Sequence, residues 1–251
     1  MTDSAKNRIP LFSIRGLRKK FPSGFMGTDG IDLDIYESEC LLIAGSNGSG
    51  KTVLMRMLSG LMEPSEGQII FRGKPLSQWG NLLRHSVGLV FQDADAQIIG
   101  ETVEEDIRFG PQNLNLEKSE INKRLDHVLK KLDLEKKRDF SPRRLSGGEK
   151  RRLAVAGILA MGCDIVIMDE PFANLDWPGV IQVRGIIEEL KSENKTVIIL
   201  THELEKIMDM AQRLVILNQG KIKDSGTPKE VLDRLKPEWG VRDPRQPYRS
   251  S

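Results

Sequence analysis

Cysteine and long apolar runs are both scarce in this sequence of 251 residues. Its two cysteines, Cys40 and Cys163, are far apart and each adjoins an apolar run, which predicts two buried thiols in a reducing cytoplasm rather than a disulfide or a metal pair. No run approaches the ~20 apolar residues that a membrane-spanning helix needs. The polar residues 1–7 lack the apolar segment of a signal peptide. We therefore expect any role at a membrane to depend on a partner.

An excess of charge of one sign is also missing, because Lys and Arg number 38 against 36 Asp and Glu, for a net charge of +2. This balance gives no reason to expect a nucleic-acid partner, and the short basic runs at residues 136–138 and 150–152 are interpreted as solvated faces. The sequence shows no internal repeat and no low-complexity tract. With 39% hydrophobic residues, it suits one globular domain, or one domain with an inserted lobe.

What the sequence does contain is a glycine-rich loop, Gly-Ser-Asn-Gly-Ser-Gly-Lys-Thr, at residues 45–52. The apolar run at residues 41–44 suits a buried strand before the loop, and residues 53–58 suit a helix that begins at it. Glycines let backbone N–H groups approach a polyphosphate, and a helix N-terminus adds a favourable dipole. Lys51 can reach the β- and γ-phosphates, and the Thr52 hydroxyl can bind Mg²⁺. We therefore expect a nucleotide site at Gly45, Ser46, Asn47, Gly48, Ser49, Gly50, Lys51 and Thr52.

Polar side chains follow three further strand-like runs. They are Gln92 after residues 87–91, Asp169 and Glu170 after residues 165–168, and His202 after residues 197–201. The carboxyl ends of parallel strands meet at one edge of a sheet, where ligands bind. We expect Asp169 to hold Mg²⁺ through water, Gln92 to sense the metal, and Glu170 to polarise the attacking water. A neutral His202 would donate a hydrogen bond to the γ-phosphate and hold the water–Glu170 pair, with Lys51 completing the catalytic set.

A second glycine-rich segment, Leu-Ser-Gly-Gly-Glu, occupies residues 145–149. Ser146 is a good N-cap for a helix through residues 153–159, and the bare N–H groups of Gly147 and Gly148 predict a second anion site. The alternative is a simple helix cap. Because one P-loop nucleotide has little use for a distant second anion site in its own chain, we expect this segment to close on the nucleotide of a partner subunit.

Apolar patterns along the rest of the chain indicate how these segments are organised. Strand-like runs predict a small antiparallel sheet from residues 11–14, 31–35 and 68–71. Short runs rich in β-branched residues, mostly separated by helical patterns, predict a parallel core sheet from residues 87–91, 165–168, 197–200 and 214–217.

Between residues 91 and 165 the sequence pattern is helical. Apolar residues recur with a helical period at positions 121, 125, 128, 129 and 132. We therefore expect one α/β domain over residues 1–236, into which a helical subdomain of about residues 93–160 is inserted. Residues 237–251 contain three prolines and no periodic pattern, so a loosely ordered tail is expected there.

In their order along the chain, these segments resemble the ATP-binding cassette (ABC) ATPases over about residues 11–230. The matching elements are the P-loop, Gln92, the signature at residues 145–149, Asp169-Glu170, Ala-Asn-Leu-Asp at residues 173–176, and His202. The resemblance implies a P-loop NTPase fold of the RecA-like kind, the cofactors ATP and Mg²⁺, and a head-to-tail dimer with two ATP molecules between P-loop and signature. It also implies that Asp176 bridges the two sites and that Phe21 lies against adenine. Ser46 stands where the family often has proline, a position that offers only its backbone.

A narrower resemblance follows Gln92. Residues 91–99 read Phe-Gln-Asp-Ala-Asp-Ala-Gln-Ile-Ile, and together with residues 102–111 and 145–161 they are similar to the energy-coupling factor subgroup, which imports vitamins and transition-metal ions. The resemblance implies that the region around Gln97 contacts a transmembrane coupling subunit. It further implies a substrate-binding membrane subunit, a second ATPase subunit that is a copy or a sister chain, and a peripheral place on the cytoplasmic face of the cell membrane.

Four other classes of ABC protein compete with this interpretation. A DNA-repair or chromosome-organising ATPase would carry a long coiled coil between P-loop and signature, whereas 94 residues without sustained heptads separate Lys51 from Ser146. A translation factor with tandem cassettes would have two P-loops. A different class of ABC transporter is disfavoured only by residues 92–111. An inactive regulatory cassette is disfavoured by the presence of Lys51, Glu170 and His202.

Overall fold

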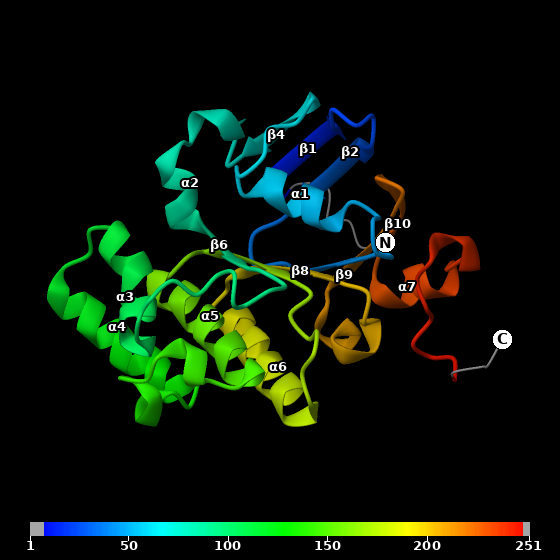
Figure 1. Ribbon diagram of the computed structural model, residues 1–251. Coiled ribbons are helices and arrows are strands. Elements are labelled where there is room, and N and C mark those ends of the chain that lie inside the picture. The colour runs from blue at the N-terminus through cyan, green and yellow to red at the C-terminus, as the bar shows by residue number, and fades with distance from the viewer. Residues whose placement is uncertain (1–7, 248–251) are drawn as a thin grey trace.

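Two β-sheets organise the computed structural model, which describes residues 8–247 (Figure 1). The smaller sheet is antiparallel, with the strand order β2-β1-β4-β5. Its strands are β1 (Phe12–Lys20), β2 (Met26–Ile35), β4 (Glu66–Phe71) and β5 (Lys74–Pro75). The apolar runs that predict strands at residues 11–14 and 31–35 are thus the buried parts of longer strands, which continue as a more exposed ribbon.

The larger sheet has the order β10-β9-β3-β8-β7-β6, and only β10 runs antiparallel to its neighbour. Its strands are β3 (Cys40–Ala44), β6 (Val87–Val90), β7 (Ile165–Asp169), β8 (Thr196–Thr201), β9 (Arg213–Asn218) and β10 (Lys221–Gly226). The parallel strands β3, β7 and β8 are buried along their whole length, as strands covered on both faces are. β10 is polar and half exposed, so the sequence has no apolar run there from which a strand could be predicted.

Alternate side chains of each core strand enter two different hydrophobic clusters. Leu41 and Ile43 of β3 pack with α1 (Lys51–Leu58) and the antiparallel sheet, whereas Leu42 and Ala44 pack with the helices on the opposite face. That opposite face carries α6 (Trp177–Ser192) and α7 (Pro228–Asp233), while α2 (Asn81–Ser86) precedes β6 at the edge of the sheet (Figure 1). The core sheet is therefore the middle layer of the molecule.

A lobe of three helices separates β6 from β7 and lies to the left in Figure 1. Its members are α3 (Val103–Asn113), α4 (Lys118–Lys131) and α5 (Gly147–Met161), which pack against one another. α4 buries the expected apolar stripe. The Arg124 guanidinium on α4 donates to the carbonyl oxygens of Ala160 and Met161, at 3.1 and 2.9 Å, and so ties α4 to the C-terminal end of α5.

Residues 237–247 make specific contacts with the rest of the domain, in a part of the chain where the lack of a periodic pattern predicts a loosely ordered tail. The Asn218 side chain donates to the carbonyl oxygen of Glu238 at 2.9 Å, and Val241 is 8% exposed. The Arg245 guanidinium bonds Asp233 at 2.6 Å and Asp243 at 2.9 Å. These polar contacts hold a segment that has no periodic pattern, and residues 248–251 lie outside the described part. Within residues 8–247, no helix combines the length and the apolar character needed to cross a membrane.

Candidate nucleotide site

The P-loop begins where β3 ends, at the edge of the core sheet at which β7 and β8 also finish. Ala44 pairs with Thr201, and Asp169 pairs with Leu200, so three strand ends lie side by side. A cavity of 250 Å³ opens at this edge. Its lining includes Phe25, Asn47, Gly48, Ser49, Gly50, Lys51, Thr52, Gln92, Asp169 and Glu170. The structure therefore brings the P-loop together with three of the polar side chains expected after the core strands.

Lys51 and Thr52 stand at the start of α1 and reach in different directions. The Lys51 ammonium donates to the carbonyl oxygens of Gly45 and Ser46, at 2.7 and 3.3 Å, and lies 3.5 Å from Glu170 Oε1. The Thr52 hydroxyl donates to Asp169 Oδ2 at 2.8 Å. The cavity is thus lined both by a buried cation and by a hydroxyl–carboxylate pair.

Burial raises the pKa of the Asp169 carboxyl above its usual range, and the neighbouring charge of Glu170 acts in the same direction. The hydrogen bond from Thr52 and the positive charge of Lys51 oppose this shift. Asp169 is therefore a carboxylate with too little compensating positive charge, next to a hydroxyl oxygen. Such oxygen donors fit Mg²⁺, which takes few protein ligands and completes its shell with water and phosphate.

Glu170 is held in an unusual backbone conformation. Its φ of 47° lies in the left-handed region, which non-glycine residues rarely adopt. Its N–H donates to the carbonyl oxygen of Leu200 at 2.8 Å, and its carboxylate accepts from the Thr201 hydroxyl at 2.8 Å. His202 donates its backbone N–H to one carboxylate oxygen at 3.3 Å, and its Nδ1 lies 3.0 Å from the other. These bonds aim a 4% exposed carboxylate into the cavity.

Other predicted residues lie outside this cavity. Ser146 caps α5, accepting from Glu149 N–H at 3.3 Å while Glu149 accepts from Ser146 N–H at 2.8 Å. A side chain at Gly147 or Gly148 would meet nothing within 4 Å, so this helix start faces open space. Asp176 caps α6 by accepting from Gly179 N–H at 3.0 Å. The chain alone therefore does not complete one site from P-loop and signature.

Sequence reasoning missed three residues that the geometry brings to the site. Phe25, rather than the expected Phe21, lines the cavity, and the two rings stack with centroids 6.0 Å apart. Thr201 bonds the Glu170 carboxylate. Arg151, only 3% exposed, donates to the Glu170 carbonyl oxygen. The signals were an aromatic residue after a Pro-Ser-Gly turn, a hydroxyl at a buried strand end, and an arginine within an apolar helix.

Comparisons with known proteins agree with this geometry. Residues 28–173 match the family model described as ABC transporter. The energy-coupling factor transporter ATP-binding protein EcfA of Methanococcus maripaludis is 38% identical over 89% of this chain and 82% of its own length. The protein of the same name from Carboxydothermus hydrogenoformans is 40% identical over 88% and 82%. The structure of cbiO1 from Clostridium perfringens, described as part of the ABC transporter complex cbiONQ, superposes with a TM-score of 0.81 at 34% identity, covering 89% of this chain and 91% of that one.

The chain therefore belongs to the ABC transporter family, and within it to the energy-coupling factor ATP-binding proteins. It is an ATP-hydrolysing subunit with the α/β P-loop fold, so the predicted fold class, activity and family are confirmed. The roles of individual site residues and the domain boundaries stay predictions.

The packing of Gly45 against β9 generates a first test. A Cβ at this position would lie 2.2 Å from the Leu217 carbonyl oxygen and 2.5 Å from Ser49 Oγ. Gly45→Ala must push the P-loop off the sheet, so we expect a destabilisation of about 1–3 kcal/mol and a loss of ATP affinity of about tenfold or more, which is the factor that 1.4 kcal/mol represents. Thermal unfolding and calorimetric titration with ATP measure both effects.

The control is Gly185→Ala on the exposed side of α6, where a Cβ meets nothing within 4 Å. This change should leave ATP affinity unchanged and add about 0.5–1 kcal/mol to helix stability. Equal ATP affinities for the two variants would contradict the view that close packing of the loop on β9 shapes the phosphate site.

Proposed function

We propose that two copies of this chain, or this chain and a sister ATPase, sandwich two ATP molecules and so power an energy-coupling factor importer for a vitamin or a transition-metal ion. The observation that carries the dimer is the separation of the two anion-binding segments. The P-loop, Gln92, Asp169 and Glu170 share one cavity, whereas Ser146 and its two glycines form an open helix start elsewhere. A partner's signature would supply the missing wall of the site.

Each side chain of the cavity has a role in the proposed reaction. Phosphate oxygens would replace the carbonyl partners of Lys51, whose ammonium already lies inside the loop. Thr52, Asp169 and Gln92 would hold Mg²⁺, which neutralises phosphate charge when bound. Glu170 would accept the proton of the attacking water.

Supporting residues surround that chemistry. His202 and Thr201 hold the Glu170 carboxylate through the bonds described above, and His202 would also face the γ-phosphate. The stacked rings of Phe21 and Phe25 would support the adenine. In the closed dimer, Ser146, Gly147 and Gly148 would bind the partner's γ-phosphate at the N-terminus of α5, and Asp176 would bridge the two sites.

The first prediction concerns the base. Glu170→Gln keeps the shape of the side chain and removes the charge that polarises water, so turnover should fall by about 10²–10⁴-fold with ATP affinity retained. Steady-state ATPase rates and equilibrium ATP binding check this together. The control Glu205→Gln changes an exposed acid nearby and should keep wild-type turnover. Near-normal hydrolysis by Glu170→Gln would remove the residue from its assigned role.

The second prediction concerns the dimer. Ser146→Arg blocks the signature and Lys51→Ala blocks the P-loop, so each variant alone should be inactive. If the chain forms homodimers that exchange subunits, a mixture contains dimers in which one composite site carries neither lesion. Partial recovery of ATPase activity upon mixing is therefore expected. Full activity of wild-type protein at concentrations where sedimentation detects only monomer would refute the sandwich.

The segment after Gln92 supports a contact with a membrane subunit. The resemblance implies that the region around Gln97 contacts the coupling subunit. In the structure the Gln97 amide turns inward, accepting from Phe91 N–H at 3.0 Å and donating to the carbonyl oxygens of Leu89 and Ala154 at 3.1 and 3.3 Å. The reason is that β6 is the outermost strand of the core sheet, so backbone groups along its free edge and just after its end have no ladder partners. The Gln97 amide is thus used in hydrogen bonds within this chain.

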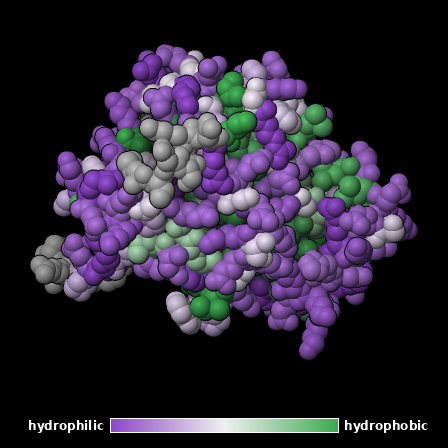
Figure 2. Space-filling view, turned by 180° about the vertical axis from the view of Figure 1, so that it is seen from behind, coloured by the Kyte–Doolittle hydropathy of each residue, from purple (hydrophilic) through white to green (hydrophobic). Residues whose placement is uncertain are grey.

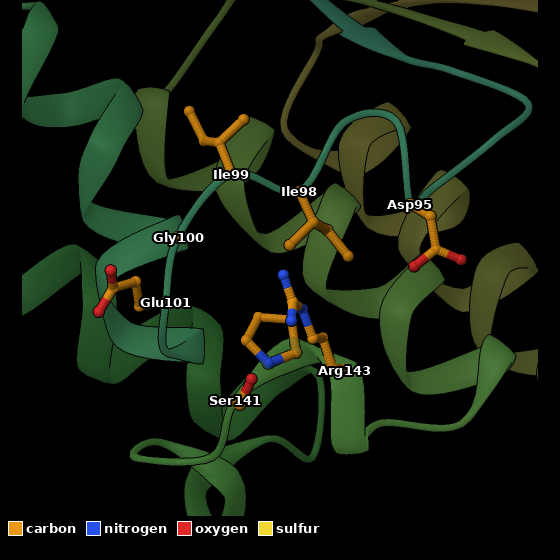
Figure 3. Close-up of a pocket in the computed structure, with 8 residues that line it drawn as sticks. Asp95, Ile98, Ile99, Gly100, Glu101, Ser141 and Arg143 are labelled. Carbon is orange, nitrogen blue, oxygen red and sulfur yellow. The ribbon is translucent and has the colours of Figure 1, made fainter.

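The side chains of the neighbouring residues Ile98 and Ile99 point in different directions (Figure 3). Ile98 packs partly against the core and points, opposite Arg143, toward a cavity of 620 Å³, while Ile99 points away from it (Figure 3). Ile99 is 58% exposed and Phe109 is 49% exposed. Both line an apolar groove of 310 Å³ formed by β6, α3 and α5, whose rim is fixed where Asp106 accepts from Ile99 and Gly100 N–H groups at 2.8 and 3.0 Å.

We infer that this groove receives an apolar helix of the transmembrane coupling subunit. The face shown in Figure 2 is mostly hydrophilic, with hydrophobic residues in separate patches. Binding there would hold the chain peripherally on the cytoplasmic face of the membrane, with a substrate-binding membrane subunit completing the importer. A swing of the lobe upon hydrolysis would then act on the membrane subunit.

The third prediction tests this groove. Ile99→Asp together with Phe109→Asp places two carboxylates where an apolar helix would bury them, at a cost of several kcal/mol. Because both side chains are half exposed in this chain, thermal stability and ATP affinity should be unchanged. Membrane association and ATP-dependent substrate uptake in the native host should be lost. The control Ile9→Asp alters an isoleucine that is 85% exposed and outside the groove, and should change neither. Unaltered uptake in the double variant would place the coupling surface elsewhere.

A further inference from the structure

α5 buries an arginine whose guanidinium bonds three backbone carbonyls. Arg151 Nη1 donates to the carbonyl oxygens of Phe91 and Gln92, at 2.6 and 2.9 Å, and Nη2 donates to that of Glu170 at 2.5 Å. The residue is 3% exposed. It stands five positions after Ser146, on the helix that begins at the signature. One side chain therefore joins the signature helix to the Gln92 segment and to the residue assigned as the base.

The guanidinium is suited to this link in a way that no other side chain is. It is planar, always charged, and offers several N–H groups in a fixed fork, so three carbonyls can be held at once without a carboxylate partner. Among the hydrogen bonds and ion pairs of residues 8–247, Arg151 has carbonyl partners only. Burial lowers the pKa of the Arg151 guanidinium, and the negative charges of Asp169, Asp93 and Glu170 oppose this shift.

The bond to Glu170 acts on a strained residue. Glu170 has a left-handed backbone, and its carbonyl oxygen is fixed by Arg151 while its N–H is fixed by Leu200. Two backbone anchors on one residue set the direction of its side chain. A displacement of α5 would pull one of these anchors, and it would pull the Gln92 carbonyl at the same time.

We infer that Arg151 is a positioning residue that couples the placement of the signature helix to the geometry of Gln92 and Glu170 in its own chain. This rests on the proposed dimer, in which the signature of one chain closes on the ATP of the other. Closure of α5 onto the partner's nucleotide then aligns the base and the metal-sensing residue of the chain's own site. Arg151 thereby links the two ATP sites through one side chain.

The first experiment separates positioning from general support of α5. Arg151→Met and Arg151→Lys should bind ATP within about threefold of wild type, while kcat falls about 100-fold, the effect of a catalytic group displaced by about 1 Å. Lysine should not rescue, since a single ammonium cannot reproduce the fork. The control Arg124→Met removes a guanidinium that donates to two carbonyls at the other end of α5. Its thermal stability should fall while kcat stays within about threefold of wild type.

Arg151→Lys keeps charge and length, so it carries the test if Arg151→Met does not fold. A kcat loss in Arg124→Met equal to that in the Arg151 variants would overturn the inference, because loosening α5 would then suffice. A wild-type kcat in Arg151→Lys would overturn it as well.

The second experiment locates the loss in purified mixed dimers that carry two different tags. One chain carries Arg151→Met, and its partner is wild type. Adding Ser146→Arg to the same chain leaves only that chain's own P-loop site active, and its turnover should fall about 100-fold relative to Ser146→Arg alone. Adding Lys51→Ala instead leaves only the partner's P-loop site, and its turnover should match that of Lys51→Ala alone.

The reverse distribution would show that Arg151 only shapes the signature, and equal losses at both sites would show a general disruption of α5. Either result overturns the inference. If the singly blocked mixed dimers have no activity even without Arg151→Met, the proposed sandwich fails instead. Arg151 is then judged by the difference in kcat between Arg151→Lys and Arg124→Met.

Discussion

Parallel pairing of β3 with β8, and of β8 with β7, is the constraint on which the nucleotide site depends. The P-loop, the Asp169-Glu170 pair and His202 come from segments more than 100 residues apart in some cases, and none contacts another through local structure. The sheet register brings them to one edge, because Ala44 pairs with Thr201 and Asp169 with Leu200. A shift of one residue between these strands would reverse every inward side chain and separate the phosphate loop from its acids. The buried aliphatic residues of the three strands therefore specify the site as much as its polar residues do.

Local chemistry explains which parts of the structure could be predicted from the sequence. The P-loop, the apolar core strands and the stripe on α4 each combine a period or a motif with a physical requirement, so their residues alone suffice. The inward turn of Gln97 could not be foreseen, because it depends on backbone groups left free along the outer edge of β6 and just after its end. Nor could the packing of the chain end, since Asn218 and Arg245 hold it through polar contacts without a pattern. Phe25 reaches the cavity from the turn between β1 and β2, and β2 lies against α1 where Gly27 meets Val53.

The helical lobe is joined to the core sheet by bonds of two kinds. Apolar contacts of α3 and α5 carry most of the burial and are indifferent to small displacements, because they have no direction. The hydrogen bonds of Gln97 and Arg151 are directional, and apart from the bond of Gln97 to Ala154 on α5 they end on the backbone around β6 and at Glu170. A lobe attached in this way can rotate as a rigid body. Its directional hydrogen bonds would transmit that rotation to the backbone around β6 and at Glu170. Arg124, by contrast, acts wholly inside the lobe and keeps it rigid.

At Glu170, the residue type that best fits the left-handed backbone differs from the residue type that supplies a carboxylate. Glycine adopts this conformation without steric penalty, so it is the residue that the backbone alone would select. The carboxylate is the one thing that glycine cannot provide. If Glu170 is the base, as proposed above, a search for stabilising substitutions would find a gain at a position where replacement also abolishes hydrolysis, as strained active-site residues generally show. In a related protein that no longer needs to hydrolyse ATP, selection for the carboxylate would be absent at this position. We would then expect glycine there, in a protein that keeps the fold and has lost catalysis.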